Sequence, residues 1–180
     1  MSNMYFLIAQ LVGLEALILL VGSYFRKNTN QILIIQILSA ICYMIHYYML
    51  GAYSGFLICL FELIRDFAYY RSEKDKYIFM CTIPIYLIFG ILTSKKAIDI
   101  LPILASLTDG YSLTKHKKFV VIGAILSHLL WIVYDFSVES YSGALTCLIV
   151  ILSNLSILFF DKSLFKEGSI SVHLDNIKRK

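Results

Sequence analysis

A stretch of 24 residues, 37–60, occurs twice in this chain and constrains its architecture more than any other feature. Shifted by 88 positions, it falls on residues 125–148 without a gap, and nine of the 24 positions are identical. The most similar part is AYSG at residues 52–55, which matches SYSG at residues 140–143. Self-similarity at a fixed offset indicates that one structural unit is built twice. We therefore expect two similar units joined by a connecting segment.

The units are expected to lie in a membrane. Of the 180 residues, 59% are hydrophobic and only 16% are charged, whereas soluble domains average near one half and one quarter. The mean hydropathy is +0.76. The basic residues behind the net charge of +4 lie in short runs between apolar segments. This spacing is typical of membrane topology and does not favour a nucleic-acid partner.

Seven segments are long and apolar enough to be candidate membrane helices, which need roughly 20 residues each. The fifth contains Asp99, Pro102 and Asp109, but the 88-residue offset places it on the first helix, so we retain it. The fold class is therefore predicted to be an all-α membrane protein with seven transmembrane helices. The segments are residues 5–25, 31–50, 53–70, 77–92, 97–114, 119–134 and 141–160.

The distribution of basic residues and the internal repeat together predict the topology. With seven spans, 13 Lys and Arg residues fall on one side, two on the other, and Arg65 lies inside a helix. An excess of basic residues marks the cytoplasmic side, so the C-terminus is expected inside and the N-terminus outside. Two parallel three-helix units need one connecting helix, which gives a 3+1+3 plan. Its parts are residues 1–72, 73–96, 97–161 and a cytoplasmic tail at 162–180.

The segments 46–55 (HYYMLGAYSG) and 63–70 (LIRDFAYY) resemble the YgjV family of bacterial inner-membrane proteins. That family is similar in turn to the PQ-loop and SWEET carriers. The wider likeness rests on the 3+1+3 plan and on Ser39-x-x-x-Tyr43 and Ser127-x-x-x-Trp131, which are similar to a Ser-x-x-x-Trp motif of SWEET helices. The resemblance implies two three-helix bundles around a central solute pocket, working by alternating access in the cell inner membrane.

Two repeated stripes are candidate walls for that pocket. Ser39, Tyr43 and His46 lie on one face of a helix, and the second copy places Ser127 and Trp131 at equivalent positions. Aromatic walls with a few polar groups suit a small polar solute. The alternative is that both stripes only pack helix against helix.

Tyr47 and Asp135 are equivalent positions of the repeat. In SWEET carriers a Tyr and an Asp close the outer gate, so the resemblance implies that the Tyr47 hydroxyl donates to the Asp135 carboxylate when the outside is shut. The alternative is that Asp135 and Glu139 are solvated acids of a loop.

The third segment carries charges inside an apolar sequence. Glu62, Arg65 and Asp66 share one helix face, and the first segment adds Glu15. Charges at this depth are costly and normally pair, so Arg65 is expected to be bound by Glu62 or Asp66. These groups either bind an anionic solute or a coupling proton, or form an ion pair that fixes packing. The second copy has Asn154 in place of Asp66, a further candidate for the solute site.

The leading prediction is a carrier for a small polar solute that works without catalysis, cofactor or metal. The four cysteines lie inside apolar segments without the spacing of metal ligands. A membrane enzyme using these acids and histidines is one alternative, and a non-transporting receptor or assembly protein is another. The expected partners are the solute, the lipid bilayer and possible further copies of the chain in a homo-oligomer.

Overall fold

The computed structural model describes residues 3–26, 29–71 and 75–160, apart from the side chains of a few helical residues, Asp66 among them. The described chain is helical and contains no strand. All seven predicted helices are present, and their ends differ from the predicted ends by a few residues. The helices are α1 (Asn3–Tyr24), α2 (Thr29–Met49), α3 (Tyr53–Arg71), α4 (Asp75–Thr93), α5 (Leu101–Leu113), α6 (Lys117–Ser137) and α7 (Tyr141–Phe160), with a short 3-10 helix, η1 (Ala97–Ile100), before α5.

The fifth segment is not the single helix that the sequence predicts. It is divided into η1 and α5, and Pro102 stands in the first turn of α5, where its missing N–H costs no helical hydrogen bond. Asp99, which appeared to interrupt this span, organises its start: the carboxylate accepts hydrogen bonds from the backbone N–H of Lys95 (2.8 Å) and Lys96 (2.9 Å).

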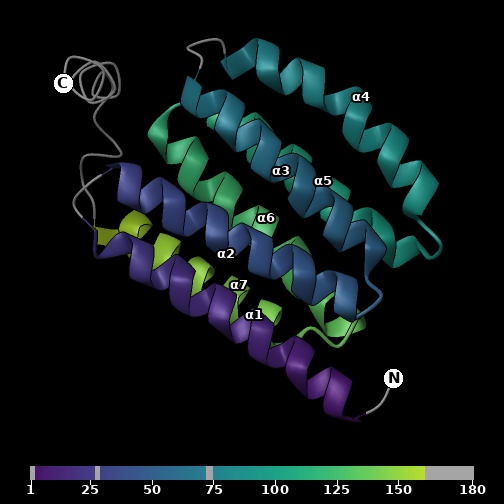
Figure 1. Ribbon diagram of the computed structural model, residues 1–180. Helices are drawn as coiled ribbons and strands as arrows, with labels where there is room; N and C mark the ends of the chain where they lie inside the picture. Colours follow the sequence, from purple (N-terminus) through teal and green to yellow (C-terminus); the bar gives the residue numbers. More distant parts are fainter. Residues whose placement is uncertain (1–2, 27–28, 72–74, 161–180) are drawn as a thin grey trace.

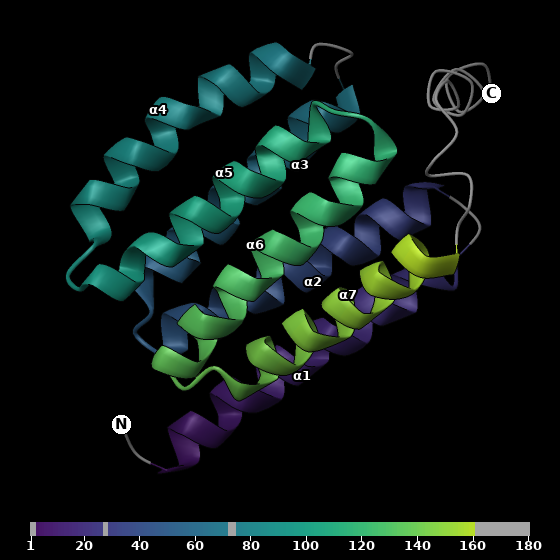
Figure 2. The ribbon, with the colours of Figure 1, turned by 180° about the vertical axis from the view of Figure 1, so that it is seen from behind.

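The helices run side by side in two layers (Figures 1 and 2). One layer holds α1, α2 and α3, the other holds α7, α6 and α5, and α4 lies at the edge against α3 and α5. The packing follows the repeat. Helix α2 contacts α1 and α3, as α6 contacts α5 and α7, and the contact of α1 with α7 has its counterpart in that of α3 with α5.

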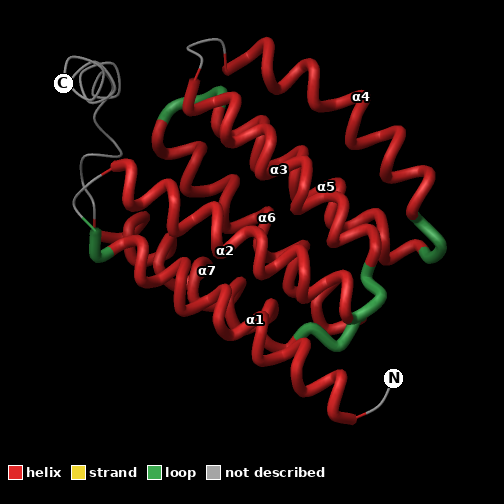
Figure 3. Tube along the Cα trace, in the orientation of Figure 1, coloured by secondary structure: helices red, strands yellow, loops and turns green. Residues whose placement is uncertain are grey.

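The chain reverses in equivalent turns at one end of the layers, which we call the N-terminal face (Figure 3). It carries the start of α1 and the loops between α2 and α3, α4 and η1, and α6 and α7. Gly51 and Glu139, one repeat offset apart, both have positive φ, at 71° and 58°. The glycines of the repeated tetrapeptides 52–55 and 140–143 are not part of these turns, because Gly55 and Gly143 lie inside α3 and α7.

The surface of this helical assembly is apolar. Three of the described helices are long and apolar enough to cross a membrane: Asn3–Ser23 of α1, and all of α6 and α7. Two shorter apolar stretches, Ile34–Met49 and Tyr77–Gly90, lie in α2 and α4. Large hydrophobic side chains such as Ile18 and Leu152 are exposed on the outside, as expected where lipid is the solvent. Polar side chains are concentrated between the helices instead.

Candidate functional site

Two groups of polar side chains lie between the helices. The first, which we call the interface cluster, comprises His46 and Tyr47 of α2, Tyr134 and Asp135 of α6, and Ser140 just before α7. All five are buried. The second, the ion-pair cluster, comprises Glu62 and Arg65 of α3 with Ser106 and Asp109 of α5. The interface cluster lies close to the N-terminal face, because its residues flank the turns there.

The centre of the interface cluster is a bond between the two copies of the repeat. The Tyr47 hydroxyl donates to Oδ1 of Asp135 at 2.7 Å. The hydrogen bond expected from the sequence is thus confirmed, while its action as a gate stays a prediction. The two residues are 88 positions apart, so one position of the repeat contacts its own copy. Asp135 is fully buried, which excludes the alternative of a solvated loop acid at this position.

Aromatic rings surround this bond. Trp131 is stacked on Tyr47 with ring centroids 5.7 Å apart and planes at 27°, and it meets Tyr134 edge to face. The Tyr134 hydroxyl lies 2.7 Å from Oγ of Ser54 and accepts the backbone N–H of Gly55 at 3.0 Å. Tyr134 therefore fixes α6 to the first turn of α3. Any side chain at Gly55 would press on Tyr134 and Tyr47, which explains glycine there.

His46 connects α2 with the start of α7. Its Nδ1 lies 2.7 Å from the carbonyl oxygen of Ala9, and its Nε2 lies 2.8 Å from Oγ of Ser140. A carbonyl can only accept, so Nδ1 carries a hydrogen and donates to Ala9. In the neutral imidazole, Nε2 then accepts the hydrogen of the Ser140 hydroxyl.

Ser140 is the functional candidate that the sequence analysis missed. Its hydroxyl contacts His46 and lies beside the Asp135 carboxylate, since Oγ of Ser140 and Oδ1 of Asp135 are 2.3 and 2.8 Å from the same Cβ position at Gly143. One side chain thus lies between an acid and an imidazole. The thiol of Cys147 donates to the other oxygen, Oδ2 of Asp135, at 3.5 Å. The available signal was a serine directly before a helix, a position where serine is favoured because its oxygen can cap the helix. That signal gives no indication of contacts across the fold.

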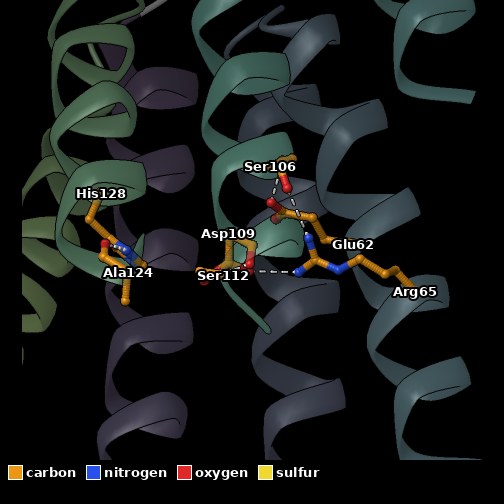
Figure 4. Close-up of polar contacts among 7 residues, drawn as sticks. All are labelled: Glu62, Arg65, Ser106, Asp109, Ser112, Ala124 and His128. Carbon is orange, nitrogen blue, oxygen red and sulfur yellow. Dashed lines mark hydrogen bonds and ion pairs between the residues drawn. The ribbon is translucent and has the colours of Figure 1, made fainter. Parts of the chain in front are cut away.

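The ion-pair cluster joins α3 to α5 (Figure 4). Arg65, whose exposed fraction is 3%, donates to Oδ2 of Asp109 at 2.9 Å and to the carbonyl oxygen of Ser106 at 3.2 Å. The Ser106 hydroxyl donates to Glu62. The sequence predicts Glu62 or Asp66 of the same helix as the partner of Arg65, whereas the ion pair with Asp109 crosses to another helix. Asp66 lies outside the described side chains.

The other candidate residues have local roles. Ser39 donates its hydroxyl hydrogen to the carbonyl oxygen of Ala16 at 2.7 Å, and Asn154 donates to Val150 of its own helix at 2.9 Å. Ser127 is buried in α6, and Glu15 is exposed on the outside of α1. These four residues do not join either cluster.

Two cavities lie beside α3. One of about 340 Å³ between α3 and α4 is apolar apart from Arg65, Thr82 and tyrosine side chains. The other, of about 200 Å³, lies between α2 and α3, with Tyr43 and Glu62 in its wall. The Tyr43 hydroxyl also bonds that of Thr146 in α7. Among the described residues, no group of His, Cys, Asp and Glu could hold a metal ion.

The comparisons with known proteins assign a family. The model of the family Imp-YgjV, described as bacterial inner membrane protein, matches residues 7–161. The chain therefore belongs to this family of inner membrane proteins, as its sequence resemblance had suggested. No curated protein matches the chain, and no solved structure does.

Proposed function

We propose that this member of the Imp-YgjV family is a carrier that moves a small polar solute across the inner membrane by alternating access. The observation that carries the proposal is the buried hydrogen bond between Tyr47 and Asp135. It joins equivalent positions of two repeated units at one face of a membrane protein. A bond in this place closes the path between the units at that face and can be broken without unfolding either unit.

The arrangement of helices supports the same proposal. Helices α1 to α3 and α5 to α7 make corresponding contacts, which fits two bundles related by a two-fold axis, with α4 as the connector. Carriers with parallel repeats bind their solute at the boundary between the repeats, near the middle of the membrane. In this scheme the N-terminal face is outside, because it holds only Lys95 and Lys96 among the basic residues of the loops.

In the closed conformation, the solute site lies deeper than the bond between Tyr47 and Asp135. Tyr43 is one helical turn further in and lies on the wall of a cavity together with Glu62. A phenol and a carboxylate suit a solute with several hydroxyl or amino groups. Opening the outer face separates Tyr47 from Asp135, and the ring of Trp131 then loses its stacking partner.

Cys147 is a native reporter for this motion, because its thiol contacts Asp135 and is buried in the closed conformation. The experiment uses full-length protein in which Cys42, Cys59 and Cys81 are replaced by alanine. A membrane-impermeant maleimide added outside should modify Cys147 slowly, and Tyr47→Phe should speed the reaction because the gate loses its hydrogen bond. Tyr48→Phe is the matched control, since Tyr48 is the exposed neighbour on the same helix. Equal rates in the three proteins would contradict the gate.

Transport itself is tested by a thermal-shift screen of sugars, nucleosides, amino acids and organic acids, followed by flux into proteoliposomes. We expect at least one class to raise the melting temperature and to enter the vesicles. Asp135→Asn should slow this flux, whereas Glu139→Gln, at the exposed acid of the same turn, should leave it unchanged. A chain that no solute stabilises and that transports none of them is not a carrier of this kind.

A membrane hydrolase is the second candidate, and one observation favours it. The Ser140 hydroxyl lies 2.8 Å from Nε2 of His46, whose Nδ1 is fixed by a carbonyl oxygen, as in a nucleophile with its base. Ser140 is fully buried and lines neither of the two cavities given above, so we favour the carrier. Covalent labelling of Ser140 by a fluorophosphonate, lost in His46→Gln, would support the enzyme.

A further inference from the structure

We propose that Asp135, Ser140 and His46 form a proton-binding site that couples solute movement to the movement of one proton. The inference rests on the proposed carrier function and names the coupling ion. It arises from one hydroxyl, that of Ser140, which lies 2.8 Å from Nε2 of the buried His46 and beside the buried carboxylate of Asp135. The three residues come from α2, from α6 and from the turn before α7. The site therefore bridges the two copies of the repeat.

With one bound proton, the hydrogen atoms of these three side chains can be arranged in two ways. Nδ1 of His46 donates to Ala9 in both of them. In the first, Asp135 is a carboxylic acid that donates to Oγ of Ser140, and the Ser140 hydroxyl donates to Nε2. In the second, His46 is an imidazolium whose Nε2–H donates to Oγ, and the Ser140 hydroxyl donates to the Asp135 carboxylate. A shift of two hydrogens along Oδ, Oγ and Nε2 converts one into the other, and the total charge is unchanged.

The surroundings favour a bound proton at this site while it is closed. Asp135 and His46 are both fully buried, and an isolated carboxylate within a membrane is costly. No Lys or Arg side chain among the described residues contacts Asp135. The titratable groups that face the site are otherwise tyrosines, thiols and acids: Tyr43 and Tyr47 on α2, Cys59 and Glu62 on α3, Asp99 of η1, Tyr134 on α6 and Cys147 on α7. None of these supplies a positive charge, so one bound proton keeps the pair of Asp135 and His46 neutral.

The same geometry couples the proton to the gate. Asp135 binds Tyr47 through Oδ1, so the bond that closes the outer face and the proton share one carboxylate. Opening separates α2 from α6, which parts His46 from Asp135 and exposes both to water. The proton can then leave or enter on that side. Gly143 permits the close approach, because a Cβ there would lie 2.3 Å from Oγ of Ser140 and 2.8 Å from Oδ1 of Asp135.

The first test needs no solute. Infrared spectra of the full-length protein in lipid, recorded in H₂O and D₂O over a pH titration, should contain the carbonyl band of a buried carboxylic acid. The band should be absent in Asp135→Asn, and in His46→Gln it should persist to higher pH because the imidazole can no longer take the proton. A spectrum of Asp135→Asn identical to that of the wild type would overturn the proposal.

The second test uses proteoliposomes with a pH-sensitive dye inside and glucose, uridine, alanine or malate as solutes. We expect solute entry to carry protons, and Ser140→Ala to reduce the proton flux by about 100-fold, the size of contribution typical of a positioned proton-transfer group. Solute exchange without net proton movement should persist in this variant. Ser140→Thr keeps the hydroxyl and should retain coupling, which separates loss of the relay from loss of folding.

The outcomes separate the two proposals. Solute flux without proton movement in the wild type, or unchanged coupling in Ser140→Ala, overturns the proton site and leaves the carrier standing. A wild-type protein that transports none of the four solutes and is stabilised by no compound in the broader screen contradicts the carrier, and coupling falls with it. The infrared band of Asp135 would then still report whether this carboxyl group holds a proton.

Discussion

The two contacts between the copies of the repeat, that of α3 with α5 and that of α7 with α1, differ in their charged residues. In one of these contacts, Arg65 of α3 in the first copy pairs with Asp109 of α5 in the second. The equivalent positions in the contact of α7 with α1 are Ser153 and Val21. Near the N-terminal face both contacts are polar: Ser54 donates to Asp99 at 3.3 Å, and the backbone N–H of Ser142 donates to Gln10 at 3.0 Å. Among the described residues, an ion pair deeper in the membrane joins α3 to α5. The hydrogen bonds described between α7 and α1 lie near the N-terminal face.

The largest effect is expected from removing Arg65, because the second copy has the uncharged Ser153 at the equivalent position. Arg65→Ala should lower the free energy of unfolding by up to about 3 kcal/mol, because it removes a buried cation and leaves the partly buried carboxylate of Asp109 without its partner. Thermal unfolding in detergent measures the loss. The double variant Arg65→Met with Asp109→Leu should recover most of it, and Ser153→Ala at the equivalent position should have no measurable effect. If Arg65→Ala and Ser153→Ala unfold alike, the ion pair does not fix this contact.

The repeated glycines provide the next largest effect. Gly143→Ala places a methyl group against Ser140 and Asp135, whereas the closest atoms at Gly55 are 3.0 to 3.2 Å away, on Tyr134 and Tyr47. Overpacking costs about 1 to 3 kcal/mol, and we expect the variant at Gly143 to be the less stable of the two. Gly22→Ala is the control, since no atom lies within 4 Å of a Cβ there. Melting temperatures that fall equally in all three variants would contradict this account.

Substitutions in the two equivalent turns should change the stability of the protein in opposite directions. Gly51→Ala puts a side chain at a φ of 71°, and Glu139→Gly removes one at 58°. A left-handed conformation costs an ordinary residue about 1 to 2 kcal/mol, so the first change should destabilise the protein. The second should stabilise it, by less than this amount because glycine also makes the unfolded chain more flexible. Chemical unfolding of both variants in the same detergent measures the two changes in the free energy of unfolding. If both variants were more stable, or both less stable, backbone strain would be excluded as the cause.

The smallest effect is expected at Ser39, which binds the carbonyl oxygen of Ala16 between α2 and α1. Hydrogen bonds between membrane helices average about 0.6 kcal/mol, so Ser39→Ala should lose about that much stability and leave solute flux unchanged. Ser137→Ala is the control, because its hydroxyl bonds a carbonyl of its own helix. If Ser39→Ala instead reduced solute flux and left stability unchanged, Ser39 would be part of the solute site.

The sequence was sufficient to predict the helices, because in a membrane each long apolar segment must satisfy its backbone internally. It also predicted the contact of Tyr47 with Asp135, through the repeat and the family resemblance. It did not predict that Arg65 pairs with Asp109 or that Ser140 lies against His46, since residues 44 and 94 positions apart share no local pattern. The partners of His46, a carbonyl oxygen of α1 and a serine of a loop, have no pattern in the sequence that could predict them.

The contact between Tyr47 and Asp135 also bears on how such a chain could arise. A three-helix unit that paired with a second copy of itself would place the same residue on both sides of the two-fold axis. Two aspartates there would repel each other, and two tyrosines could not supply a carboxylate. Only after duplication and fusion, through a segment such as α4, can one copy keep the donor and the other the acceptor. The single chain can therefore place a hydrogen-bond donor opposite an acceptor at this position. A symmetric dimer would place two identical residues opposite each other there.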